Sequence, residues 1–184
     1  MFTSLISIAL MAGIGPAVPQ NTAKDLPDAS EVKAAFNASK GKVRIVMLVS
    51  PTCPACVSGA DIIRKDVLTK VKDKRLATFS VYIPMIFGDG KAPAVKASQE
   101  MTKLGVPSFW DGKRELGNAY GQVVKLPMNK KTAWDIYFIY GPDAVWSDAP
   151  PKPVYWMHQL GNDDLCLDGN KFRAAVEKQL KALK

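Results

Sequence analysis

The sequence predicts an α/β domain in which helices flank a central mixed sheet. Two segments, 43–49 and 135–140, are apolar at nearly every position, as in strands that are covered on both faces. Between them, segments with strand spacing alternate with segments with helix spacing, and this order suits crossover connections between parallel strands. Two cysteines, Cys53 and Cys56, stand at the first junction between a strand and a helix. We therefore expect a single domain over residues 24–184.

The composition is that of an ordinary globular protein. The chain has 184 residues, 47% of them hydrophobic and 23% charged, which excludes disordered, collagen-like and coiled-coil architectures. Beyond the first residues, no apolar run is long enough to span a bilayer. The formal net charge of +8 is dispersed and is not gathered with aromatic residues into a basic surface. Nucleic acid is therefore not an expected partner.

Residues 1–23 predict a signal peptide or an N-terminal anchor. The first charged side chain is Lys24, and an apolar segment before it ends in small residues with a cleavage point after Ala17. No lysine or arginine precedes this apolar segment, so an uncleaved anchor and a buried N-terminal helix stay open. We expect an exported protein, periplasmic or secreted, that touches a membrane only through an uncleaved N-terminal segment.

The first elements follow from apolar spacing. A helix is predicted over 28–38, where Val32 and Phe36 share one side. The strand over 43–49 follows a glycine. After Cys56 the apolar residues change to helical spacing, which predicts a helix over 57–74 that can cross between two parallel strands.

The second half of the chain continues the alternation. Apolar residues at alternate positions predict a strand over 75–86, and helical spacing predicts a helix over 93–104. The strand over 135–140 is followed by a turn and by 144–146, and together these indicate a hairpin. The chain closes with a helix whose apolar residues share one side: Phe172, Val176, Leu180 and Leu183.

The strongest chemical signal is the sequence Cys53-Pro54-Ala55-Cys56. Two intervening residues let the sulfurs meet across one helical turn, so the pair can change between dithiol and disulfide with little backbone movement. Cys53 is expected at the helix N-terminus, where free N–H groups and the helix dipole favour a thiolate. Cys56 lies one turn further in. Cys53 is therefore the expected nucleophile and Cys56 the resolving thiol.

Two other interpretations of this pair stay open. The pair can belong to a soft-metal-binding module that also uses Cys166 or His158, the chain's one histidine. Alternatively, a closed disulfide can belong to a non-catalytic scaffold that holds a partner. So short a loop gains little stability from a cross-link, and the position between strand and helix favours redox chemistry over zinc. No cofactor is expected.

The region from Val43 to Trp146 resembles the thioredoxin-like superfamily, within an uncharacterised branch of exported bacterial proteins. The resemblance implies a thioredoxin-like fold and thiol–disulfide oxidoreductase activity, with Cys53 as nucleophile and Cys56 as resolving thiol. Thr52 departs from the family, which usually has tryptophan there. Pro107 resembles the family's cis-proline but comes too early, so an insertion over about 106–133, before the terminal hairpin, is favoured.

The expected activity is the reduction or exchange of disulfides outside the cytoplasm. Pro54 and Ala55 bring neither charge nor histidine between the cysteines, so a strongly oxidising couple near about −120 mV is not indicated, and a reducing one near about −270 mV is favoured. The expected substrate is a protein or small-molecule disulfide or thiol. We further expect an unidentified redox partner and a monomeric protein.

Four other features invite a functional interpretation. His158 can act as a base near the thiols, but a buried, hydrogen-bonded histidine is favoured. Cys166 can be a third thiol, but a buried apolar role is favoured. Two Trp-Asp pairs, at 110–111 and 134–135, can line a groove beside the motif, although core packing of both tryptophans is favoured.

Overall fold

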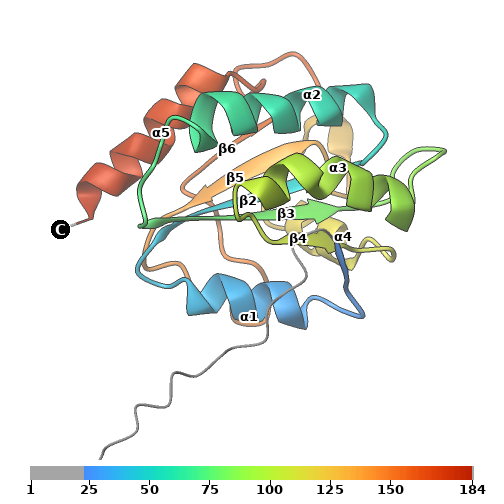
Figure 1. Cartoon of the computed structure of the whole chain (residues 1–184), viewed down its shortest axis with the longest axis horizontal. Coiled ribbons are helices and arrows are strands. Elements are labelled where there is room, and N and C mark those ends of the chain that lie inside the picture. Colours follow the sequence, from blue (N-terminus) through green and yellow to red (C-terminus); the bar gives the residue numbers. More distant parts are fainter. Residues whose placement is uncertain (1–22, 184) are drawn as a thin grey trace, which may run out of the picture.

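The structure, a computed structural model, describes residues 23–183 (Figure 1). The predicted signal peptide or anchor over 1–23 lies outside the described residues, apart from Ala23. Within residues 23–183, none of the helices combines the length and the apolar character that a membrane span requires.

A mixed sheet of six strands forms the centre of the domain. Its order is β1-β4-β3-β2-β5-β6, in which the first four strands are parallel and β5 and β6 are antiparallel to their neighbours. The strands are β1 (Lys24–Asp25), β2 (Val43–Val49), β3 (Leu76–Tyr82), β4 (Ser108–Trp110), β5 (Ile136–Tyr140) and β6 (Tyr155–His158). The α-helices are α1 (Ser30–Ala38), α2 (Pro54–Ile62), α3 (Lys91–Lys103), α4 (Glu115–Gly121) and α5 (Gly169–Ala182).

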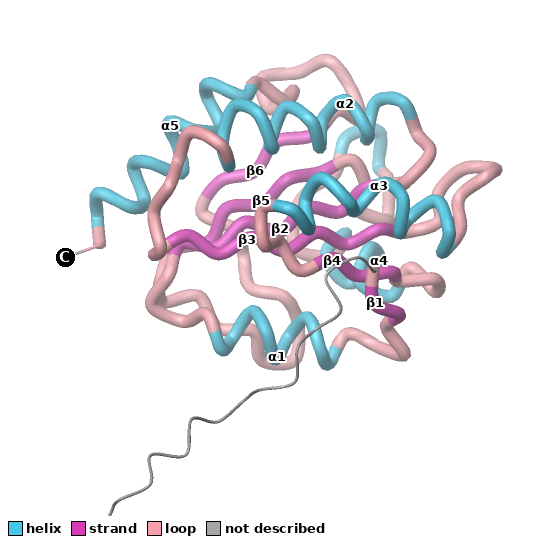
Figure 2. The backbone as a smooth tube through the Cα atoms, viewed as in Figure 1, coloured by secondary structure: helices cyan, strands magenta, loops and turns pink. Residues whose placement is uncertain are grey.

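Helices cover both faces of the sheet, as the sequence predicts. In Figures 1 and 2, α2, α3 and α5 lie on one face and α1 lies on the other. The core residues of α4, among them Leu116 and Tyr120, belong to the α1 side. All seven residues of β2 are buried, since β2 lies between β3 and β5 with helices above and below. This confirms the prediction made from its nearly continuous apolar sequence.

The predicted return strand of the hairpin over 144–146 is wrong. β5 pairs instead with β6, and Ile136 lies opposite His158. The reason is that Trp146 turns inward to pack on the α1 side, with its ring edge-on to Phe36 at 6.0 Å between centroids. The side chain of Asn37 donates to the Trp146 carbonyl and accepts from its N–H, each at 2.9 Å, so this segment is bonded to α1 rather than to the sheet.

A buried arginine holds the loop after β5. Arg44, in β2, is fully buried, and its guanidinium lies 4.4 Å from the centre of the Phe36 ring. The guanidinium donates to four backbone carbonyls, those of Phe36, Gly141, Pro142 and Ala144. Because a guanidinium has five N–H donors, it can satisfy several buried carbonyls at once.

Replacing Arg44 with methionine is therefore expected to lower the free energy of unfolding by about 2 kcal/mol, since carbonyl groups that the arginine satisfies lose their partner. Urea denaturation measures the change. Arg75→Met is the control, because Arg75 is exposed and pairs with Asp73 at the surface, where an ion pair contributes little. Equal losses in the two variants would contradict this role of Arg44.

The helix after the cysteines differs from the predicted 57–74 segment. It begins at Pro54, as the expected position of Cys53 at the helix N-terminus implies, continues past Ile62 as one π-helical turn, Ile63–Leu68, and ends six residues before the predicted limit. The wider turn lies against the start of α5, where Arg173 donates to the Asp66 carbonyl at 3.0 Å. Spacing alone could not predict this turn, because the contact that accompanies it comes from a helix about a hundred residues away.

The residues between β3 and β5 supply α3, β4 and α4. β4 lies inside the predicted insertion over about 106–133 and pairs with β3 in parallel, and Pro107 directly precedes it. The described residues contain no cis peptide bond, and the bond before Pro107 is accordingly trans. The residue that directly precedes the antiparallel strand β5 is Asp135. The boundaries of the insertion remain a prediction.

Candidate functional site

The two cysteines lie where β2 ends and α2 begins. Cys53 is the N-cap residue of α2, with extended backbone angles, and its carbonyl accepts from the N–H of Val57 at 3.0 Å. Pro54 is the first helical residue, where its missing N–H costs no hydrogen bond. Cys56 is the third helical residue, so both sulfurs are on the first turn.

The two thiols differ in exposure. Both are free thiols in the structure, Cys53 is partly exposed, and Cys56 is fully buried. Burial raises the pKa of Cys56, and the neighbouring Asp135 carboxylate raises it further, while a hydrogen bond with the Cys53 side chain acts in the same direction. A molecule in solution can therefore reach Cys53 directly, whereas the Cys56 thiol requires a neighbouring base to lose its proton.

Asp135 is a buried carboxylic acid beside Cys56. Its exposed fraction is 1%, and its φ of 51° lies in the left-handed region, which aspartate tolerates better than most residues. Burial raises its pKa to about 6, although hydrogen bonds from Tyr137 and Cys56 favour the ionised form. At pH 7 to 8 this group is an ionised proton acceptor next to the second thiol.

Tyr137 and Gly59 complete the surroundings of Asp135. The Tyr137 hydroxyl donates to the Asp135 carboxylate at 3.0 Å. Burial raises the pKa of Tyr137 well above its ordinary value, so the phenol keeps the proton that it donates. A Cβ at Gly59 in α2 would lie 2.0 Å from this hydroxyl and 2.2 Å from an oxygen of Gln159. Only glycine lets α2 approach so closely.

Gly59→Ala is therefore expected to destabilise the fold by about 2 kcal/mol, because the added methyl group must displace α2 from the Tyr137 hydroxyl. Ser58→Ala, at the exposed neighbouring position of the same helix, is the matched control and is expected to change stability by less than about 0.5 kcal/mol. Denaturant unfolding compares the two. A Gly59→Ala variant as stable as the control would show that the contact is not tight.

Asp89 ties two loops together on the other side of the motif. Its carboxylate accepts five hydrogen bonds, of 2.7 to 3.0 Å, from Ser50 Oγ, Thr52 N, Thr52 Oγ1, Met85 N and Ile86 N. Burial opposes its ionisation, but the hydrogen bonds outweigh burial, so the pKa of Asp89 is lower than usual. Thr52, which precedes Cys53 at the position where thioredoxins usually have tryptophan, is thus held by a carboxylate.

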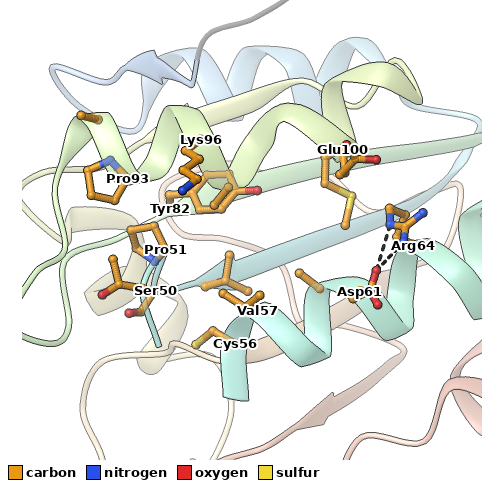
Figure 3. Close-up of a pocket in the computed structure, with 16 residues that line it drawn as sticks. Ser50, Pro51, Cys56, Val57, Asp61, Arg64, Tyr82, Pro93, Lys96 and Glu100 are labelled. Carbon is orange, nitrogen blue, oxygen red and sulfur yellow. Dashed lines mark hydrogen bonds and ion pairs between the residues drawn. The ribbon is translucent and has the colours of Figure 1, made fainter. Parts of the chain in front are cut away.

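An apolar pocket opens beside the motif, between α2 and α3 (Figure 3). Its volume is about 780 Å³, and Cys56 is one of its lining residues. In Figure 3, Val57 of α2 and Lys96 of α3 lie on opposite walls, and the Asp61–Arg64 ion pair lies at one end. Cavities of this size suit a small ligand or a substrate side chain.

His158 is not placed as a catalytic base. Its ring is fully buried, Nδ1 accepts from the Leu160 N–H at 3.0 Å, and Nε2 lies 3.1 Å from Asp163. Burial lowers the pKa of His158, although Asp163 opposes this shift. The favoured interpretation of a buried, hydrogen-bonded histidine is confirmed.

Cys166 is exposed, so the favoured interpretation of a buried apolar cysteine is wrong. It lies in an irregular segment before α5 and pairs with His158 of β6 in an isolated backbone bridge. Among residues 23–183, no three His, Cys, Asp or Glu side chains are grouped so that they could hold a metal ion. The structure thus does not bring Cys166 or His158 to the Cys53–Cys56 pair as metal ligands.

The sequence motif identifies both cysteines but not their polar neighbours. Asp135 belongs to a Trp-Asp pair that was singled out for its tryptophan, and Asp89 lies between two glycines with no signal of its role. Trp110 and Trp134 are partly buried and pack against the core, as favoured.

No family model and no curated protein matches the chain. Solved structures do. A thioredoxin-like protein in the oxidised form is 16% identical, with a TM-score of 0.51 over 78% of this chain and 80% of that one. A thiol:disulfide interchange protein of the thioredoxin family from Chlorobium tepidum TLS is 14% identical, with a TM-score of 0.50 over 78% and 83%. A candidate protein disulfide isomerase from Bacteroides thetaiotaomicron is 15% identical, with a TM-score of 0.50 over 80% and 77%. At this identity the likeness establishes the fold, which confirms the predicted thioredoxin-like architecture.

Proposed function

We propose that this chain, which has the thioredoxin-like fold, is a thiol–disulfide oxidoreductase. One observation carries the proposal: a partly exposed thiol at the N-cap of α2 lies beside a second, buried thiol one turn further along. This arrangement suits a nucleophile that meets substrate and a second thiol that attacks only afterwards. The names of the three solved structures agree with this chemistry.

The reaction proceeds in two exchanges. The Cys53 thiolate attacks one sulfur of a substrate disulfide, forms a mixed disulfide and releases the other substrate sulfur as a thiolate, which takes up a proton. The Cys56 thiolate then attacks Cys53 Sγ and releases the second substrate thiolate. The substrate gains two electrons, and the Cys53–Cys56 pair becomes a disulfide that a dithiol partner must reduce again.

Asp135 supports the second exchange. Cys56 is buried and its pKa is raised, so at neutral pH it needs a base to become nucleophilic. Asp135 lies beside it, is ionised above a pH of about 6, and can hold the proton after transfer. The Tyr137 hydroxyl stabilises the ionised carboxylate by its hydrogen bond.

The physiological direction that we propose is reduction or exchange of disulfides outside the cytoplasm, with residues 1–23 as export signal or anchor. The absence of charge and histidine between Cys53 and Cys56 supports a reducing couple. The proposed partners are a disulfide substrate and a separate reductant, and the protein acts as a monomer.

Selective alkylation tests the proposal. A limited amount of iodoacetamide is added to the reduced protein, the modified cysteines are identified by mass, and insulin reduction is assayed in parallel. Loss of activity is expected to follow alkylation of Cys53, while exposed Cys166 is modified without loss and buried Cys56 is spared. Full activity with Cys53 alkylated would overturn the proposal.

A further inference from the structure

The pocket between α2 and α3 is not explained by the thiol exchange. Cys56 lines it, but Cys53, the thiol expected to meet the substrate, is not among its lining residues. Most of the lining is apolar and comes from both helices, with Val57, Ala60, Ala97 and Met101 among its members. A cavity of about 780 Å³ with apolar walls and few polar groups has the size and character of a site for a small ligand.

A buried hydroxyl at this pocket has no partner in the protein. Tyr82, the last residue of β3, is 2% exposed, and its hydroxyl points into the pocket (Figure 3). Ser80 lies nearby, but its Oγ pairs with Ser108 Oγ at 2.7 Å, and no group among residues 23–183 forms a hydrogen bond with Tyr82 Oη. Burial raises the pKa of Tyr82 to about 12, although Ser80 opposes the shift, so the phenol keeps its proton at neutral pH. A ligand that accepts this proton in a hydrogen bond would remove the cost of the unpaired group.

The charged residues that line the pocket favour an anion. Asp61 is paired with Arg64, and Glu100 is paired with Lys103 at the surface. Lys96 is exposed on α3, one turn before Glu100, and within the described part of the chain it has no ion-pair partner. The lining thus offers one positive charge that a negatively charged group of a ligand can compensate.

We propose that this pocket binds a small organic acid whose apolar body lies between α2 and α3 and whose carboxylate accepts from the Tyr82 hydroxyl and is compensated by Lys96. A carboxylate accepts several hydrogen bonds and donates none, which suits a phenol and an ammonium group. The apolar walls suit an aliphatic chain or an aromatic ring. The occupant is distinct from the disulfide substrate, which must reach Cys53, so binding here does not depend on the proposed redox function.

A titration followed by nuclear magnetic resonance tests the site on the reduced full chain, since the structure has free thiols. The probe is 3-phenylpropanoate, which carries one carboxylate on an apolar body, and the amide signals of α2 and α3 are followed. Saturable shifts with a Kd of about 1 mM or below are expected, which is usual for so small a ligand. The cation 3-phenylpropylammonium has the same apolar body and is expected to bind at least about tenfold more weakly.

Tyr82→Phe removes only the hydroxyl, and because that hydroxyl has no partner in the protein, the folded state stays intact. The Kd for 3-phenylpropanoate is expected to rise about tenfold, which corresponds to one hydrogen bond to a charged group. Tyr140→Phe is the matched control, because it removes another buried hydroxyl, on the α1 side of the sheet, and is expected to leave the Kd unchanged.

Lys96→Gln is expected to raise the Kd about threefold, since an exposed charge contributes less than a buried hydrogen bond. Lys178→Gln removes the same charge from an exposed position on α5 outside the pocket and is expected to have no effect.

Three results would overturn the site while the redox proposal stands. The first is a parent protein whose α2 and α3 signals do not shift in a saturable way with 3-phenylpropanoate. The second is a Tyr82→Phe variant with the Kd of the parent. The third is a parent protein that binds 3-phenylpropylammonium as tightly as the acid.

Discussion

Replacing Cys53 with serine is expected to reduce catalysed disulfide reduction to the uncatalysed background. A serine hydroxyl is not ionised at neutral pH and forms no disulfide, so the first exchange cannot occur. The buried Cys56 cannot replace Cys53, since its side chain is closed to solvent and its pKa is raised. Insulin reduction measures the loss, and Cys166→Ser is the matched control, because Cys166 is exposed and lies outside the motif.

Replacing the second cysteine of the pair is expected to give a different result. Cys56→Ser keeps the nucleophile but removes the resolving thiol, so a mixed disulfide between Cys53 and substrate is expected to accumulate and to be visible as an added mass. Catalysis that survives in both the Cys53→Ser and Cys56→Ser variants would contradict the assignment of the two roles.

Replacing Asp135 with asparagine is expected to slow the resolving exchange at least a hundredfold, which is the lower end of the usual contribution of a positioned base. Asparagine keeps the shape of the side chain and tolerates the positive φ, but it cannot accept a proton. The rate at which the mixed disulfide resolves is expected to fall below a pH of about 6 in the parent protein, where the carboxylate becomes protonated. This dependence is expected to disappear in the variant.

The stability of the fold is expected to depend on pH in the opposite direction from the resolving rate. The pKa of Asp135 is raised from 3.8 to about 6, so the folded state binds the proton more tightly than the unfolded state does. The stabilisation from this proton is complete below pH 4 and is lost as the pH rises to about 6, which amounts to about 3 kcal/mol. Asp135→Asn is therefore expected to be more stable than the parent at pH 8.

Exposed Asp164 provides the control, and Asp164→Asn is expected to alter neither the resolving rate nor the unfolding midpoint at pH 8. An Asp135→Asn variant that resolves the mixed disulfide at the parent rate would show that Asp135 is not the base. A variant that is less stable at pH 8 would show that the hydrogen bond from Tyr137 outweighs the burial of charge.

Local patterns were sufficient to predict the centre of the fold. β2 matches its predicted bounds because a strand buried on both faces needs an apolar residue at nearly every position. The thiol pair was equally predictable, because its chemistry depends on a spacing of three residues, which places both cysteines on one helical turn. Pro54 marks the start of α2 for a similarly local reason.

Features that depend on distant contacts were not predictable. β6 was not predicted, because polar and apolar residues alternate little along it and it follows a proline-rich segment. The apolar residues at 144–146 were predicted to form the return strand instead. The roles of Asp89 and Asp135 arise only when separate loops meet at the motif. One aspartate has a lowered pKa and the other a raised one, because the first accepts five hydrogen bonds and the second is more deeply buried.

An equilibrium redox titration tests the central claim most directly. The reduced and oxidised proteins are equilibrated in dithiothreitol or glutathione buffers, quenched by alkylation and analysed by mass, so that Cys53, Cys56 and Cys166 are counted separately. We expect Cys53 and Cys56 to titrate together as one two-electron couple, towards the thioredoxin end of a range from about −270 to about −120 mV, while Cys166 stays a thiol. A Cys53–Cys56 pair that stays oxidised in excess dithiothreitol, or that never forms a disulfide, would contradict the assignment of this pair as a redox centre.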